Sequence, residues 1–241
     1  MLDHERELRS GCLTGGFWQG NVDRVTVLRT CPRCGAVARQ PGLFSSAWLC
    51  DEHGEIIPVG PAKAPTPDMI HSVARDSLVP VWVPRPMPEH WMITGLQWAG
   101  DEHGGTVAVV VGLSGPQPIP EVGDEEPTAD LIFVAEQPGV GLGSHLGGLN
   151  GIDPGPLLQE KVLHDPAEIK LDAGGHEIPL WSVPVDGGIA YVGEAAGVWL
   201  WLLAWPETAA AVLLTRFALV DMREHGMDVD LPCGALTPRL R

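Results

Sequence analysis

The chain has 241 residues, which suffice for one large domain or for a small domain joined to a larger one. Acidic residues outnumber basic ones by 31 to 15, and the formal net charge of −16 disfavours a protein that grips polyphosphate backbones. The most apolar stretch, Val198 to Ala204, is far shorter than the roughly 20 residues that a membrane helix requires. Five cysteines form no disulfide framework and no signal peptide is visible, so we expect a cytoplasmic protein.

Residues 1–24 mix charged, glycine and small polar residues without a period, which predicts a disordered tail. The next segment, residues 25–60, contains two pairs of potential metal ligands, each pair separated by two residues and the pairs separated by fifteen. These ligands are Cys31, Cys34, Cys50 and His53.

This spacing predicts a structural zinc ribbon. A glycine follows the second ligand of each pair, so the backbone can turn tightly and direct its amides toward the ligand sulfurs. The gap between the pairs has room for one strand out and one strand back, with a turn at Gln40–Gly42. Four protein ligands leave no open position for water, which disfavours a catalytic zinc, and a histidine as fourth ligand disfavours a rubredoxin-like iron site.

Residues 61–78 are predicted to form a linker and a short helix. Several prolines between Pro61 and Pro67 favour an extended chain, and the helix is expected over Asp68–Asp76. The segment Val79–Pro88 is too rich in proline for a central strand, so we expect an edge strand or a covering arm there.

Apolar, β-prone runs follow, and the expected hairpin turn between the first two is Gly100–Gly105. The predicted strands are Trp91–Ala99, Thr106–Leu113, Leu131–Glu136, Glu168–Leu171, Glu177–Val183, Ile189–Glu194 and Val198–Trp205. Gly115–Ala129 and the Gly-rich stretch up to Pro156 are predicted loops, and Ala209–Asp221 fits either strand or helix. In the last predicted strand Trp199 and Trp201 alternate with apolar neighbours, which is typical of a central strand buried on both faces, although an aromatic face for ligand stacking is an alternative.

We therefore predict an α+β fold that is mostly β. An N-terminal zinc ribbon precedes a curved antiparallel β-sheet domain, residues 79–225, with few short helices, and residues 226–241 form a C-terminal tail. Long helical patterns between the strands are missing, which disfavours a βαβ fold.

Two further features suggest alternative functions. The loop Gly139–Gly148 follows a predicted strand, so its amides could bind an anionic or phosphorylated small molecule, although no P-loop lysine follows it. Arg29, Arg33 and Arg39 lie in the ribbon segment without an acidic residue between 25 and 49, which leaves a nucleic-acid contact as a third hypothesis. The remaining histidines are scattered and we find no catalytic set.

Several motifs carry a resemblance that covers roughly residues 29–225. They are CPRCG, QPGLFSSAWLCDEHG, VPVWVPRPMPEHW, VAEQPGVGLG with DPGP, and YVGEAAGVWLWLLAWPE. With these motifs the chain resembles a family of uncharacterised actinobacterial proteins of unknown function, some of which carry a phosphotransacetylase label. The family usually begins a few residues before the first cysteine pair, so residues 1–24 depart from its pattern.

The residues favour a non-enzymatic zinc-binding adaptor protein whose partner is another protein. The alternative is an enzyme that acts on an anionic or phosphorylated small molecule through Gly139–Gly148. No residue in that loop supplies the chemistry of acyl or phosphoryl transfer.

Overall fold

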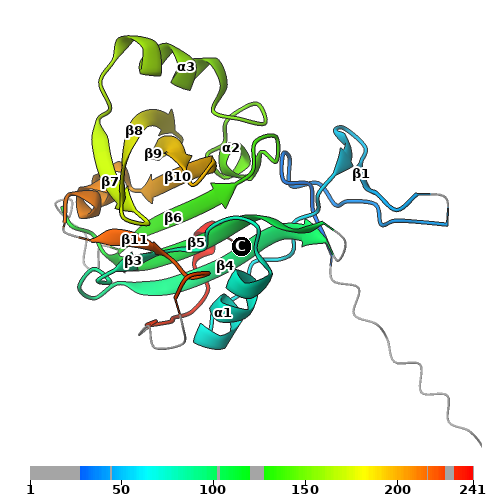
Figure 1. The fold of residues 1–241 in the computed structure, drawn as a ribbon, viewed down its shortest axis with the longest axis horizontal. Coiled ribbons are helices and arrows are strands. Elements are labelled where there is room, and N and C mark those ends of the chain that lie inside the picture. The colour runs from blue at the N-terminus through cyan, green and yellow to red at the C-terminus, as the bar shows by residue number, and fades with distance from the viewer. Residues whose placement is uncertain are drawn as a thin grey trace, which may run out of the picture.

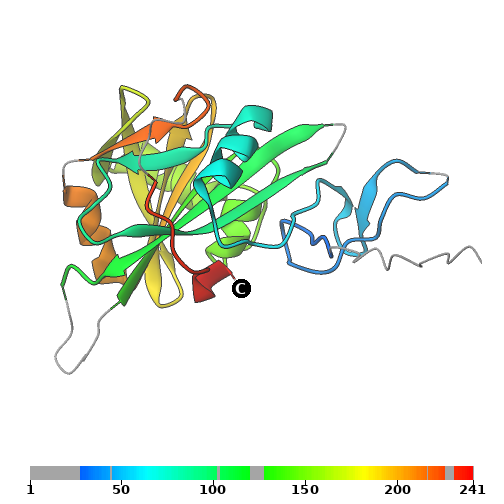
Figure 2. The same cartoon turned by 90° about the horizontal axis from the view of Figure 1, so that it is seen from below.

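The computed structural model describes residues 28–43, 45–101, 104–119, 128–215, 217–225 and 231–240. The predicted tail 1–24 lies outside these residues. The described chain forms a small ribbon unit, residues 28–60, and a large curled sheet, and the ribbon unit stands beside the sheet in both views (Figure 1, Figure 2).

The ribbon unit is built on a short hairpin of β1 (Trp48–Cys50) and β2 (Gly54–Ile56). Isolated bridges extend it, pairing Thr30 with both Val37 and Val59, and Arg39 with Leu49. The chain thus runs out and back between the two ligand pairs, as the spacing predicted. The amide of Gly42 donates to the Ser45 carbonyl at 2.9 Å, so the turn lies slightly beyond the expected position.

Nine strands form the large sheet within the described part of the chain, in the order β3-β11-β7-β8-β9-β10-β6-β5-β4. Their bounds are β3 (Trp82–Arg85), β4 (Met92–Asp101), β5 (Gly105–Pro116), β6 (Thr128–Glu136), β7 (Ile169–Ala173), β8 (His176–Val185), β9 (Gly188–Ala195), β10 (Val198–Trp205) and β11 (Ala218–Asp221). Neighbouring strands are antiparallel except β11 and β7, which pair in parallel. The predicted fold class is confirmed, and the proline-rich β3 lies at an edge as expected.

Helices cover both faces of the sheet. α1 (Pro67–Asp76) starts at Thr66, whose Oγ1 accepts the Met69 amide at 3.2 Å, and it packs on one face. α2 (Leu142–Leu146) and α3 (Gly155–His164) lie at the other face (Figure 1). The prediction of a loop up to Pro156 is wrong for both helices, since α2 and the start of α3 lie inside it. None of the described helices is long and apolar enough to cross a membrane.

The core lies on both faces of the central strand β10. Leu200 and Leu202 belong to the cluster that α1 covers, while Trp201 and Leu203 belong to the cluster beneath α2 and α3. Trp201 is fully buried. The alternation in this strand therefore marks a strand buried on both sides, as predicted.

The C-terminal third contains two departures from expectation. The ambiguous segment Ala209–Asp221 holds both a 3₁₀ helix (Glu207–Leu214) and a strand, β11, so each alternative is correct for one half. Residues 231–240, expected as a tail, pack on β4: the Ile93 amide donates to the Pro232 carbonyl at 2.8 Å, and Leu240 is buried. The domain boundaries themselves stay predictions.

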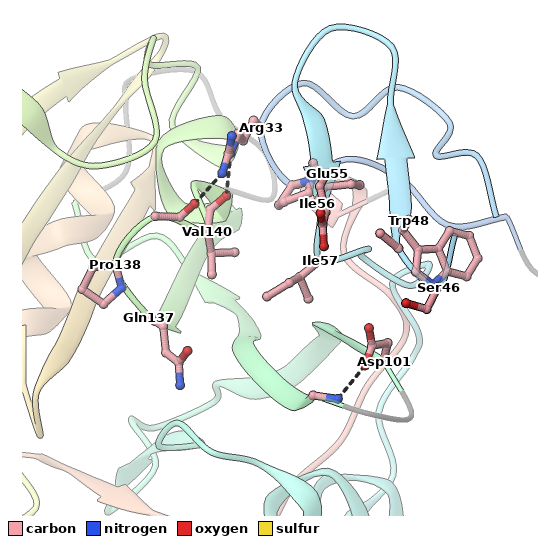
Figure 3. Close-up of a pocket in the computed structure, with 14 residues that line it drawn as sticks. Arg33, Ser46, Trp48, Glu55, Ile56, Ile57, Asp101, Gln137, Pro138 and Val140 are labelled. Atoms are coloured by element: carbon pink, nitrogen blue, oxygen red, sulfur yellow. Dashed lines mark hydrogen bonds between the residues drawn. The ribbon is translucent and has the colours of Figure 1, made fainter. Parts of the chain in front are cut away.

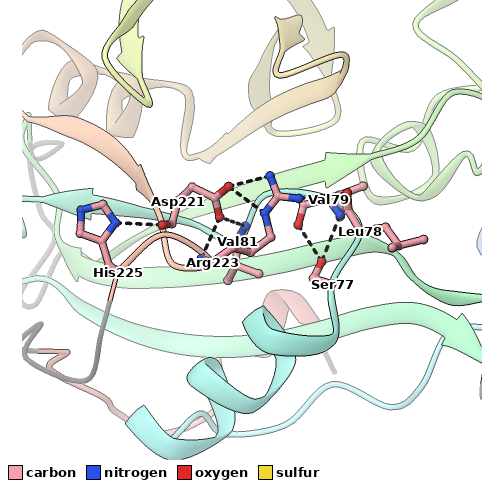
Figure 4. A network of polar contacts seen from close by, with 7 residues as sticks. All are labelled: Ser77, Leu78, Val79, Val81, Asp221, Arg223 and His225. Carbon is pink, nitrogen blue, oxygen red and sulfur yellow. Dashed lines mark hydrogen bonds and ion pairs between the residues drawn. The ribbon is translucent and has the colours of Figure 1, made fainter.

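A polar network fastens the end of β11 to the segment between α1 and β3 (Figure 4). The buried Asp221 carboxylate accepts the Val81 amide at 3.1 Å and Nε of Arg223 at 2.8 Å. Nη1 of Arg223 then donates to the Leu78 carbonyl at 3.0 Å. Every charged group in the network is paired, so its role is to hold the edge of the sheet.

Candidate metal centre

The four predicted ligands come together in the ribbon unit. The ligand atoms of Cys31, Cys34, Cys50 and His53 all lie within 4.8 Å of one another. Sγ of Cys34 lies 3.7 Å from Sγ of Cys50, and Nδ1 of His53 lies 3.7 Å from Sγ of Cys31 and 3.6 Å from Sγ of Cys50. The four side chains are thus close enough to hold a single metal ion.

Two tight turns place these ligands. Gly35 and Gly54, the residues after each ligand pair, have φ angles of 68° and 69°, a left-handed conformation that glycine adopts without strain. In the first turn the Gly35 amide donates to the Cys31 carbonyl at 2.9 Å, and the Arg33 amide points at Sγ of Cys31 at 3.5 Å. The glycines therefore play the part that the sequence assigned to them.

The environment of the thiols already favours one thiolate. Burial raises the pKa of Cys31 to about 11. Burial also opposes the ionisation of Cys50, but the amides of Glu52 and His53, together with the His53 and Cys31 side chains, lower the pKa of Cys50 to about 6. A bound cation would favour the thiolate form of every ligand cysteine, because metals bind thiolates rather than thiols.

The first turn of the ribbon docks on the Gly-rich loop of the large domain, a contact that the sequence did not reveal. Nη2 of Arg33 donates to the Gly139 carbonyl at 2.8 Å, and its Nε donates to the Val140 carbonyl at 3.4 Å. Beside it, a Cβ added to Gly35 would meet Nε2 of His145 at 3.1 Å, so the backbone approaches this imidazole closely. The two regions that the sequence marked as separate candidates are therefore in contact.

Three amides of the Gly-rich loop donate to carboxylates of the chain itself. Glu136, at the end of β6, accepts the Leu142 amide through Oε2 at 2.7 Å and the Gly143 amide through Oε1 at 3.1 Å. Oδ1 of Asp153 accepts the Gly139 amide at 3.1 Å. The geometry that suggested an anion site thus serves internal carboxylates.

Glu136 is a buried acidic residue of the candidate site that the sequence analysis did not identify. Its side chain is fully buried, and burial raises its pKa to about 7 although the Leu142 and Gly143 amides lower it. The nearby Trp201 indole lowers the pKa of Glu136, although the indole N–H does not reach hydrogen-bond geometry. The negative charge of Asp153 raises the pKa of Glu136 further. An acid at the end of an apolar strand before a glycine-rich stretch is the signal that could have pointed to it.

The three arginines of the predicted basic patch all have partners within the protein. Besides Arg33, Arg29 donates from Nη1 to the Gly100 carbonyl at 3.0 Å, with its guanidinium 6.0 Å from the centre of the Trp48 ring. Arg39 pairs with Asp51 at 3.2 Å on the surface. Arg29 and Arg33 therefore brace the ribbon unit against the large domain.

The fold and the cluster define a β-rich protein that carries a four-residue Cys/His cluster able to hold a metal ion. The chain belongs to the family described as "Family of unknown function (DUF6758)", whose model matches residues 25–240. The comparisons with curated proteins and with solved structures gave no match.

Proposed function

We propose that this protein binds one structural zinc ion and acts as a non-enzymatic adaptor for another protein. The spacing of the ligand atoms carries the proposal. Zinc–sulfur bonds of about 2.3 Å and zinc–nitrogen bonds of about 2.0–2.1 Å place tetrahedral ligands about 3.8 Å apart for two sulfurs and about 3.6 Å apart for sulfur and nitrogen. The separations of 3.7 Å between Cys34 and Cys50 and of 3.6–3.7 Å from His53 to two sulfurs fit these values.

The proposed zinc stabilises the ribbon unit rather than performing catalysis. Three thiolates and one imidazole complete its coordination and leave no site for water. The unit has a small core of Cys31, Cys50, Ala38 and Ile56, so most of its stability must come from the ion, on the order of 10 kcal/mol in units of this size.

Two observations support an adaptor rather than an enzyme. The Leu142 and Gly143 amides, which an anionic substrate would need, are held by Glu136. The ribbon unit, which projects from the large domain (Figure 1), also exposes apolar side chains, with Val37 63% and Leu43 98% accessible. Exposed apolar groups on a projecting element favour a protein partner over a small molecule.

A nucleic-acid contact through the ribbon has less support. Arg29 and Arg33 donate to backbone carbonyls of the large domain, so little of their hydrogen-bonding capacity is left for phosphates. The net charge of −16 repels a polyanion. Free thiolate ligands favour a reducing compartment, so we propose the cytoplasm as the location.

Substitution of one ligand tests the structural role of the metal. Cys34→Ser should release the ion and make the ribbon unit sensitive to limited proteolysis while the large sheet stays folded, because the core beneath α1 does not include the ribbon. Cys233→Ser is the matched control, since this half-buried cysteine lies outside the cluster. A Cys34→Ser ribbon that resists protease as well as the wild type does would contradict the structural role.

Calorimetry tests the adaptor against the enzyme. Phosphate, acetyl phosphate and nucleotides should bind no more tightly than about 1 mM, or about −4 kcal/mol. A micromolar constant that is lost in Gly141→Val would show that the loop is an active site, because the left-handed φ of 89° at Gly141 strains any other residue.

A further inference from the structure

We propose that Cys34 and Cys50 form a reversible oxidation site, at which hydrogen peroxide converts the two thiolates to a disulfide, expels the metal ion and loosens the ribbon unit from the large domain. This oxidation site rests on the proposed structural zinc, and it adds redox control to the proposed adaptor. Three features of the ribbon unit support it: the separation of the two sulfurs, the exposure of one of them, and the contact that the neighbouring Arg33 makes with the large domain.

The two sulfurs lie close enough for a disulfide to form with little movement. Sγ of Cys34 lies 3.7 Å from Sγ of Cys50, and a disulfide holds its sulfurs about 2.05 Å apart. The gap to close is therefore about 1.7 Å, which rotation of the two side chains can supply. Cys34 ends the first ligand pair and Cys50 begins the second. A disulfide here would therefore tie the two ligand turns to each other in place of the ion.

Cys34 is the ligand cysteine that an oxidant in solution can reach. Cys31 and Cys50 are buried, with 1% and 3% of their surface accessible, whereas Cys34 is only partly buried. The three residues that follow Cys34, residues 35–37, are all exposed, so the outer side of this turn faces solvent. A cysteine that binds zinc does so as a thiolate, and the thiolate is the form that attacks peroxide. Cys34 is therefore the first sulfur to react, and Cys50 is the neighbour that completes the disulfide.

The reaction consumes one peroxide and two thiolates. The Cys34 sulfur attacks one peroxide oxygen, the O–O bond breaks and hydroxide leaves, which produces a sulfenic acid. The Cys50 thiolate then attacks the Cys34 sulfur, the S–O bond breaks, and a second hydroxide leaves as the disulfide forms. The two sulfurs together lose two electrons, the peroxide gains them, and the buffer protonates both hydroxides.

Disulfide formation would remove the ion from the ribbon unit. Of the four ligands only Cys31 and His53 would remain, and two ligands do not complete the tetrahedral coordination that a structural zinc requires. The small core of the ribbon unit depends on the ion for most of its stability. Oxidation should therefore loosen the whole unit and not only the two turns.

The same event would weaken the docking of the ribbon unit on the large domain. Cys34 directly follows Arg33, whose guanidinium donates to the carbonyls of Gly139 at 2.8 Å and Val140 at 3.4 Å (Figure 3). Movement of the Cys34 sulfur and loss of the ion would both disturb the turn that holds Arg33 in place. Peroxide would thus act on the contact between the two units through a site on the ribbon alone.

The experiment treats the zinc-loaded full chain with excess hydrogen peroxide and follows the released zinc with a chromogenic chelator. Trypsin cleaves after Arg33 and Arg39, so each cysteine of the cluster falls in a peptide of its own, and mass spectrometry without reduction identifies the linked pair. One zinc should be lost for each disulfide between Cys34 and Cys50, and limited proteolysis of the ribbon should become about tenfold faster. Dithiothreitol with added zinc should reverse both changes.

Cys12→Ser and Cys233→Ser are the matched controls, because neither cysteine is a ligand of the proposed zinc, and both variants should release zinc at the wild-type rate. The oxidation site would be overturned by zinc that stays bound while the same peroxide oxidises glutathione, by a disulfide that involves Cys31, or by a control variant that keeps its zinc. Each of these results leaves the zinc site itself intact. Protein that holds no zinc before peroxide is added would instead refute the proposed structural zinc and, with it, the oxidation site.

Discussion

Replacing Glu136 by glutamine removes a buried carboxyl whose ionisation the fold opposes. Burial raises the pKa of Glu136 from 4.5 to about 7, against the effect of the Leu142 and Gly143 amides. The folded chain therefore holds this proton more tightly than the unfolded chain does. The resulting stabilisation is fully present below pH 4.5 and is lost as the pH rises to about 7.

The magnitude follows from the two pKa values. The difference between about 7 and 4.5 corresponds to on the order of 3 kcal/mol, at about 1.36 kcal/mol for each tenfold change in proton affinity. Glutamine does not titrate, so the free energy of unfolding of the wild type, minus that of Glu136→Gln, should fall by this amount between pH 4.5 and about 7.5.

Urea unfolding of both proteins across this pH range measures the difference. The comparison cancels changes that affect both proteins equally, including protonation of the metal ligands at low pH. Glu160→Gln, an exposed carboxyl on α3, is the matched control. Parallel stability profiles for the wild type and Glu136→Gln would refute the reasoning, because they would show that Glu136 titrates alike in the folded and unfolded chains.

Three further changes test the packing. Trp201→Ala should cost about 3–5 kcal/mol in urea unfolding, because the indole is fully buried between the sheet and α2; a loss below about 1 kcal/mol would mean that the site is exposed. Arg33→Ala should cost about 1–3 kcal/mol and speed proteolysis of the ribbon, since two loop carbonyls lose a charged donor; an unchanged cleavage rate would contradict the docking contact. Gly143→Ala should lower the free energy of unfolding by about 1–3 kcal/mol, because the new Cβ would lie 2.4 Å from Cδ1 of Trp201. Gly42→Ala is the control, since a Cβ at Gly42 meets nothing within 4 Å. Equal unfolding free energies for the two variants would argue against the close approach of Gly143 to Trp201.

The ligand set was predictable because metal ligands in a ribbon are local in sequence. Each pair of ligands and its following glycine form one turn, so spacing alone locates the cluster. Central strands such as β10 were predictable for a similar reason, because an unbroken apolar run marks a strand covered on both faces. Helix α3 was missed because its apolar pattern is weak: it begins with glycine and proline, and Val162 and Leu163 are exposed.

The docking of the ribbon could not be predicted from the sequence. Arg33 lies more than a hundred residues from the carbonyls of Gly139 and Val140, and no local pattern encodes such a contact. The sequence suggested an anion site in the Gly-rich loop because it, too, does not reveal contacts with distant side chains. The amides of this loop look free in a sequence, and only the structure shows that the Glu136 side chain turns back from β6 to occupy two of them.

The metal centre is tested most directly by elemental analysis of freshly purified protein, combined with X-ray absorption at the zinc edge. The account predicts one zinc per chain, with three sulfur ligands at about 2.3 Å and one nitrogen at about 2.0–2.1 Å. Cys34→Ser should lose this signal and Cys233→Ser should keep it. Protein that contains no stoichiometric metal, or iron in place of zinc, would contradict the account.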